Sequence, residues 1–183
     1  RDDQSHAGRI ARYLDTRVEE NIGILVLFTS WRLCFQVEEL LEDAVRKVTL
    51  VQGQRPLALL LQEHAKQRKR GMMSIIFGLQ SMAEGIDLPG DLANEVVITR
   101  LPFQPPDDPR EATLAEYLKN QGRDPFTELS LPSATIRLRQ AVGRLIRSET
   151  DTGQVTMLDS RLVNTRWGQS LLSELPAFEF IEE

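Results

Sequence analysis

The sequence predicts an α/β protein: a three-layer parallel sheet with helices on both faces. Five short apolar runs alternate with helical patterns, as in strand–helix–strand units whose strands pair in parallel. The run at 22–28 is continuously apolar, which indicates a strand buried on both faces. The chain has 183 residues, of which 41% are hydrophobic and 27% charged. This is enough for one well-buried domain, or for a domain with a sizeable insertion.

The predicted helices and strands alternate in chain order. Helical spacing of apolar residues covers 5–20, 31–45 and 56–70. Pro56 fits the first turn of the third helix, where its missing N–H costs little, and Gly71 ends that helix. The remaining predicted strands cover 47–51, 73–77, 95–99 and 154–158.

Residues 102–132 interrupt this alternation. They contain six prolines: Pro102, Pro105, Pro106, Pro109, Pro125 and Pro132. A helical pattern covers 111–120, but the segment is too polar and too rich in proline to form a core strand. We therefore expect an insertion at about 103–131 in a domain that spans residues 1–183.

Charge and hydropathy restrict the class of protein. The formal net charge of −5 argues against a generally sticky nucleic-acid binder, but it does not exclude a local basic groove. No apolar run approaches the roughly 20 residues needed to span a bilayer, and no signal-type segment is present, so the chain reads as cytosolic. The first residue is Arg1 and not methionine, which leads us to expect a fragment or a processed chain.

The cysteine and histidine content gives little sign of a metal site. Cys34 is the only cysteine, which excludes an intrachain disulfide, and one cysteine with two histidines argues against structural zinc. Cys34 falls on an apolar helix face, so we expect it to be buried. His6 and His64 have no partner pattern and are expected at the surface. The basic run 66–70 ends a predicted helix, where cations interact favourably with the helix dipole, and is interpreted as a solvated helix end.

Ligands of open parallel sheets bind at the carboxyl ends of the strands, so the residues that follow each strand are the candidate site. Residues 78–90 form a loop in which Gly85 would let backbone approach a ligand and Asp87 could hold a ribose hydroxyl or orient an arginine. An ordinary capped turn is the alternative. Ser30, Trp31 and Arg32 follow the first strand and offer a hydroxyl, a ring and a charge suited to nucleic acid. Core packing of the Trp31 ring remains open.

Gln140, Arg144 and Arg147 fall on one stripe of a predicted helix, opposite an apolar face, with Gly143 inside the helix. Guanidinium groups held in this way suit a phosphate chain, and an arginine can stabilise the charge that develops during phosphoryl transfer. A solvated basic helix face is the alternative. Asp159 and Arg161, after the last strand, are expected to form an ion pair that braces this helix.

Taken together, these segments resemble the motifs of superfamily 2 helicases. Residues 140–147 resemble motif VI, residues 83–88 motif V and residues 26–31 motif IV. Residues 78–81, 129–134 and 172–178 add further matches. Their order and spacing resemble the second, C-terminal RecA-like lobe of the XPD/Rad3-like branch, and within it the bacterial DinG/YoaA-type helicases.

The resemblance implies an ATP-driven motor that moves along single-stranded DNA, typically 5′ to 3′, in repair or replication. ATP and Mg²⁺ would be held mainly by a first lobe, with Arg144 and Arg147 as catalytic contacts to the γ-phosphate and Gln140 positioning them. The other residues that it implies are Glu84, Gly85 and Asp87 at the nucleotide, and Ser30, Trp31, Arg32 and Ser81 along the DNA.

The chain lacks a phosphate loop, an acidic magnesium motif and the four-cysteine iron–sulfur region of many relatives. We therefore expect the first helicase lobe of the same protein as a partner, any iron–sulfur cluster to lie outside this chain, and no ATPase activity from the chain alone. The alternative is a RecA-like docking module that binds a replication or repair protein. No membrane partner is expected, and the expected location is the bacterial cytoplasm.

Overall fold

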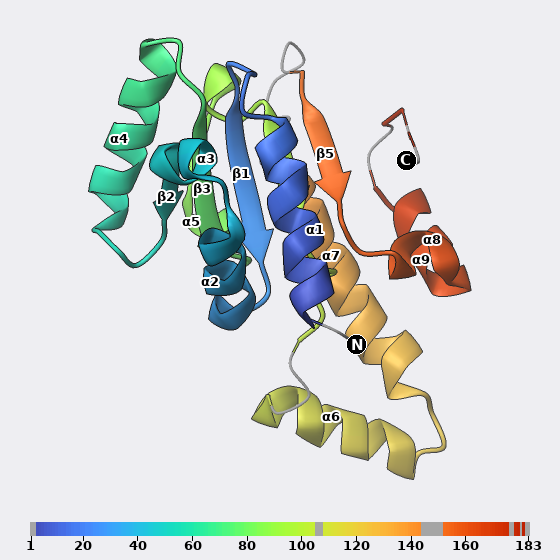
Figure 1. The fold of residues 1–183 in the computed structure, drawn as a ribbon. Coiled ribbons are helices and arrows are strands. Elements are labelled where there is room, and N and C mark those ends of the chain that lie inside the picture. Colours follow the sequence, from blue (N-terminus) through green and yellow to red (C-terminus); the bar gives the residue numbers. More distant parts are fainter. Residues whose placement is uncertain (1–2, 105–107, 144–151, 176–177, 180, 182–183) are drawn as a thin grey trace. The chain divides into compact units, whose positions relative to one another are not determined.

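The computed structural model describes residues 3–104, 108–143, 152–175, 178–179 and 181 (Figure 1). The chain forms two compact units. Unit 1 comprises Arg1–Arg100 with Ala141–Leu158, and unit 2 comprises Leu101–Gln140 with Asp159–Glu183. Each unit is described separately below.

Unit 1 is built on a five-stranded sheet in the order β2-β3-β1-β4-β5. Its strands are β1 (Gly23–Phe28), β2 (Thr49–Val51), β3 (Ser74–Leu79), β4 (Glu95–Ile98) and β5 (Gln154–Met157). Every pairing is parallel, and Val26 in the central strand lies opposite Phe77 and Val97. The predicted parallel α/β fold is therefore confirmed, with each strand within two residues of its expected position.

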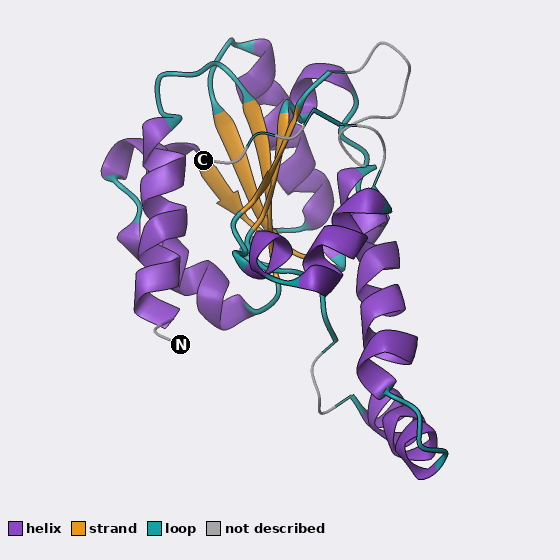
Figure 2. Cartoon of the chain, turned by 90° about the vertical axis from the view of Figure 1, so that its right-hand side faces the viewer, coloured by secondary structure: helices purple, strands orange, loops and turns teal. Residues whose placement is uncertain are grey.

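Helices lie on both faces of this sheet (Figures 1 and 2). Unit 1 contains α1 (Asp3–Thr16), α2 (Trp31–Leu40), α3 (Asp43–Val48), α4 (Leu57–Lys69), α5 (Met82–Gly85) and the short η1 (Gly90–Leu92). Successive side chains of a strand point to opposite faces. Phe28 and Phe77 face the core formed with α1, α2 and α3, where their rings meet edge to face at 4.9 Å. Ser74 faces the other side and contacts His64 of α4.

The helix predicted over 31–45 is in fact two helices, α2 and α3. The helix is interrupted at Leu41, whose backbone is extended and whose side chain is buried. Arg46 explains how the break is tolerated. Its guanidinium donates to the carbonyl oxygens of Glu38, Glu39 and Leu41 at 3.2, 3.0 and 2.6 Å, which satisfies acceptors at the end of α2.

The surface placement predicted for both histidines is wrong. The His64 ring is fully buried and lies 2.8 Å from Ser74 Oγ and 2.6 Å from the Leu92 carbonyl oxygen. His6 is 9% exposed and its Nε2 lies 2.9 Å from the Thr99 carbonyl oxygen. Each imidazole therefore links separate elements by hydrogen bonds inside the unit. The predicted burial of Cys34 is confirmed.

Unit 2 is mainly helical. Its elements are α6 (Pro109–Asn120), η2 (Phe126–Ser130), α7 (Leu131–Val142, whose last two residues belong to unit 1), α8 (Arg161–Asn164) and α9 (Arg166–Ser173). The helix predicted at 111–120 is confirmed as α6, which begins earlier because Asp108 caps the N–H groups of Arg110 and Glu111. Phe103, Phe126 and Trp167 pack together with ring centroids 5.4–5.8 Å apart. The assignment of residues 1–183 to one lobe with an insertion at 103–131 stays a prediction.

Candidate functional site

The loops that follow β1, β2 and β3 lie side by side at the carboxyl edge of the sheet. Hydrogen bonds join them beyond the last strand residues: Gln80 N–H donates to the Phe28 carbonyl at 3.0 Å, and Gln52 N–H to the Phe77 carbonyl at 2.8 Å. The Gln52 side chain adds a third link, because its Oε1 accepts from Leu79 N–H at 2.8 Å. The structure therefore brings the segment at Ser30 next to the segment at Ser81.

Ser30 begins α2 at this edge. Its Oγ accepts from Leu33 N–H at 3.3 Å, and Leu33, Cys34 and Val37 anchor the helix in the core. Trp31 and Arg32 remain exposed. Trp31 is 36% exposed, so it is not packed in the core.

The loop after β3 alternates buried anchors with exposed positions. Its buried apolar residues are Met82, Ala83, Ile86 and Leu88. Ser81, Gly85 and Asp87 are exposed between them. A Cβ atom at Gly85 would meet nothing within 4 Å, so the space beside this backbone is open to a ligand. Glu84 belongs to α5, but its side chain lies outside the described residues.

Packing explains the glycine that precedes this loop. A Cβ atom at Gly78 would lie 2.3 Å from the Met82 sulfur and 3.3 Å from Gln52 Oε1. Gly78 therefore allows Met82 to close onto the strand, and Gln52 to reach the Leu79 amide. Both contacts fix the course of residues 80–88.

The arginine segment is only partly described. Gln140 lies in the last turn of α7 and is exposed. Gly143 is a turn residue after the helix ends at Val142, whereas the prediction placed it inside the helix. Arg144 and Arg147 lie outside the described residues, so their roles stay predictions.

The predicted ion pair between Asp159 and Arg161 is confirmed, and its bracing of the arginine helix stays a prediction. The Arg161 Nε and NH2 atoms lie 2.9 and 2.5 Å from the two carboxylate oxygens of Asp159. Asp159 also accepts from Leu101 N–H at 3.0 Å. Burial on its own raises the pKa of Asp159, but the hydrogen bonds from Arg161 and from backbone N–H groups outweigh it and hold the pKa below its ordinary value. The pair therefore fixes the start of the 101–104 segment.

The basic run 66–70 is more than a solvated helix end. Lys66, Lys69 and Arg70 lie toward solvent, as predicted. Arg68 is half-buried and donates to the carbonyl oxygens of Asn21, Met72 and Asp91, and to Asn21 Oδ1, at 2.6–3.0 Å. Arg68 therefore ties the end of α4 to two loops at the amino edge of the sheet.

Sequence reasoning missed two members of the carboxyl edge. Gln52 directly follows β2, and the rule that ligands bind after strands would have found it. Phe35 lies one helical turn after Trp31 and stacks on its ring, with centroids 5.7 Å apart and an interplanar angle of 18°. The i, i+4 spacing of the two aromatic residues was the available signal.

Metal binding and membrane insertion find no support in the described part of the chain. There, His, Cys, Asp and Glu side chains form no group of three or more that could hold a metal ion. Each helix in the same ranges is too short or too polar to cross a bilayer.

The family described as "Helicase C-terminal domain" matches residues 14–178. The chain belongs to this family. This helicase C-terminal domain is 40% identical over 177 residues to the ATP-dependent DNA helicase DinG of Photobacterium profundum, covering 95% of the chain and 26% of that protein. It is 41% identical over 178 residues to DinG of Escherichia coli (strain K12), covering 96% and 25%. The domain thus spans about a quarter of the length of these relatives.

Solved structures share the fold of this helicase C-terminal domain. A structure named XPD helicase superimposes with a TM-score of 0.71 at 24% identity, covering 94% of the chain and 31% of that protein. A second, named XPD apo, also gives 0.71, at 22% identity, covering 94% and 35%. The predicted resemblance to DinG-type helicases is therefore confirmed by the sequence, and the two XPD structures share the fold of the chain.

Proposed function

We propose that this chain is the second motor lobe of an ATP-dependent DNA helicase that moves 5′ to 3′ on single-stranded DNA in repair or replication. The observation that carries the proposal is the identity of about 40%, over 95% of the chain, to proteins named ATP-dependent DNA helicase DinG. The chain would work with a first lobe of the same protein, in the bacterial cytoplasm.

In the proposed reaction, water attacks the γ-phosphorus of ATP, the bond to the β–γ bridging oxygen breaks, and ADP and phosphate leave. Arg144 and Arg147 would donate hydrogen bonds to the γ-phosphate oxygens and stabilise the charge that develops there, with Gln140 orienting them. The first lobe would hold the phosphates and Mg²⁺, which neutralises charge on the phosphate oxygens.

The loop after β3 would face the nucleotide. Gly85 supports this role because its backbone is exposed and open space lies beside it. Asp87 is exposed on the same loop, where its carboxylate would accept a hydrogen bond from a ribose hydroxyl or an arginine. Glu84 would complete this group.

Residues at the start of both loops would contact DNA. Ser30 and Ser81 are exposed at one edge, and Arg32 adds a positive charge. Hydroxyls and guanidinium groups are common partners of phosphate oxygens. Motion of residues 80–88 on nucleotide binding would reach the DNA contacts directly, because Gln80 N–H is bonded to the strand end before Ser30.

The decisive test is the DNA-stimulated ATPase activity of the full-length protein that contains this chain. Arg144→Ala and Arg147→Ala should each lower turnover by about 100-fold or more, equivalent to about 3 kcal/mol of transition-state stabilisation. Arg139→Ala, at an exposed position of α7, is the matched control and should change turnover by less than about twofold. Unchanged turnover in both variants, with unchanged thermal melting, would refute the arginine roles.

One observation favours a second, docking role. Leu114 and Tyr117 lie one turn apart on α6 and are 49% and 58% exposed, so together they offer an apolar contact surface. Replication or repair proteins are the proposed partners. A Tyr117→Ala variant that keeps ATPase activity but no longer co-purifies with a partner would support this role, and retained co-purification would count against it.

A further inference from the structure

Trp31 and Phe35 form a stacked pair of rings on the surface of α2. Their centroids lie 5.7 Å apart with an interplanar angle of 18°, and the two residues are 36% and 44% exposed. Leu33, Cys34 and Val37 on the same helix are buried, so the helix is fixed by its other face. The exposed rings are therefore held on a rigid element.

The Trp31 ring lies near the loop that follows β2. The Trp31 Cη2 atom lies 3.8 Å from the position that a Cβ atom at Gly53 would occupy. Gly53 has a φ of 88°, a backbone conformation that favours glycine, so this turn places no side chain beside the ring. The stacked Phe35 ring limits the rotation of the Trp31 side chain, so less rotational freedom would be lost when a ligand stacks on the pair.

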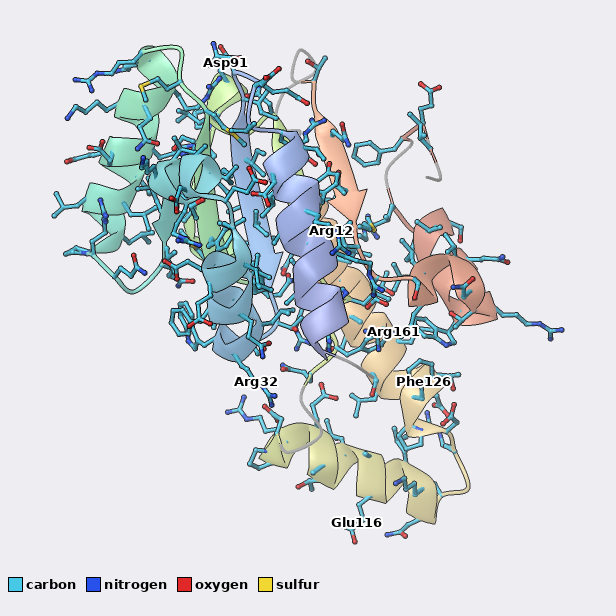
Figure 3. All side chains as sticks on the ribbon, in the orientation of Figure 1. Arg12, Arg32, Asp91, Glu116, Phe126 and Arg161 are labelled. Atoms are coloured by element: carbon cyan, nitrogen blue, oxygen red, sulfur yellow. The ribbon has the colours of Figure 1, made fainter. Side chains whose placement is uncertain are left out.

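The charges around the pair indicate where an anionic chain would pass. Arg32 projects from the first turn of α2, which contains no acidic residue (Figure 3). The amino end of the helix adds positive potential. Glu39 is exposed one turn beyond Phe35 and would repel phosphate there. A phosphate backbone is therefore favoured on the Arg32 side, with its bases toward the rings.

We propose that Trp31 and Phe35 form a stacking platform for a base of single-stranded DNA, with Arg32 contacting the adjacent phosphate. Stacking on an aromatic pair is tolerant of sequence because every base has a π-face, which suits a motor that must pass along any strand. The inference rests on the proposed function, and it adds Phe35 and a base contact to a site otherwise described by contacts to the backbone.

The test measures the affinity of the full-length protein for fluorescein-labelled oligothymidylate by anisotropy. Trp31→Ala and Phe35→Ala should each weaken binding by about 5- to 150-fold, the equivalent of about 1–3 kcal/mol of base stacking. Trp31→Phe should retain most of the affinity, and Leu59→Ala, at an exposed apolar position of α4, should leave it unchanged. Thermal melting checks that each variant is folded.

An oligonucleotide with abasic sites separates stacking from phosphate contacts. The wild type should bind it more weakly than it binds oligothymidylate. The Trp31→Ala variant should bind both oligonucleotides with the same affinity. Equal losses in both proteins, or wild-type affinity of both alanine variants, would overturn the platform. In that case the proposed function still stands as long as Arg144→Ala abolishes DNA-stimulated ATPase activity. If the wild type binds no single-stranded DNA, the proposed function fails and the platform with it.

Discussion

His64 is the buried polar side chain of unit 1 whose replacement should have a large and measurable effect. It lies 2.8 Å from Ser74 Oγ and 2.6 Å from the Leu92 carbonyl oxygen, and so joins α4 to β3 and η1. His64→Ala would leave the buried Ser74 hydroxyl without this partner and open a cavity, while water would still reach the half-buried Leu92. We expect the free energy of unfolding to fall by about 2–4 kcal/mol.

The same side chain predicts a pH dependence of stability. Burial lowers the pKa of His64 below its ordinary 6.5, the hydrogen bond to the Leu92 carbonyl opposes this, and the charge of Arg68 adds to the lowering. In the unfolded chain His64 therefore binds a proton near pH 6.5, whereas in the folded chain it stays neutral until the pH is lower. This contribution to stability is complete above pH 6.5 and is lost as the pH falls toward the folded pKa, by at most about 1.4 kcal/mol per pH unit.

Urea unfolding followed by circular dichroism, between about pH 5.5 and 7.5, measures both effects. His64→Gln cannot titrate in this range and should show a smaller loss of stability toward acid than the wild type. His6→Gln is the matched control, and it should keep the contribution of His64 to the pH dependence of the free energy of unfolding. The reasoning is refuted if His64→Gln retains the full acid slope, or if His64→Ala unfolds within about 0.5 kcal/mol of the wild type.

Three further predictions concern other positions. Burial raises the pKa of Cys34 to about 12, so iodoacetamide at pH 8 should alkylate it only after urea is added, as seen by mass spectrometry. Arg17→Met removes the ion-pair partner that lies 3.3 Å from Glu95, whose side chain is 1% exposed, and should cost about 1–3 kcal/mol in urea unfolding. Gly168→Ala would place Cβ 2.3 Å from a backbone carbonyl oxygen and should lower the melting temperature. Gly85→Ala has open space beside it, so it should melt like the wild type. In the full-length protein, however, it should raise the KM for ATP.

Local patterns were sufficient to predict the sheet and most helices. The strand at 22–28 is continuously apolar because it is the central strand β1, covered on both faces. The two-part helix at 31–48 could not be predicted in this way. Its break depends on where the Arg46 guanidinium lies once the chain has folded, and the apolar spacing continues across it.

The burial of polar side chains was the least predictable property. His6 contacts Thr99, which is 93 residues away, and His64 contacts Leu92, which is 28 residues away. Each partner is a backbone carbonyl or a small hydroxyl, and such groups leave no motif in a sequence. The loops at the carboxyl edge could be predicted because ligands of parallel sheets bind at the carboxyl ends of the strands, whatever the order of the strands in the sheet.

At the candidate site, exposed residues alternate with buried ones, so the two kinds can be compared by mutation. In residues 82–88, buried Met82, Ala83, Ile86 and Leu88 hold the loop, while Gly85 and Asp87 are exposed. Replacing an anchor should therefore lower stability and activity together. Replacing Gly85 should lower activity with little change in stability, because open space lies beside its backbone. The same separation should hold on α2, between buried Leu33 and exposed Trp31, so comparing melting with turnover distinguishes residues that build this edge from residues that work at it.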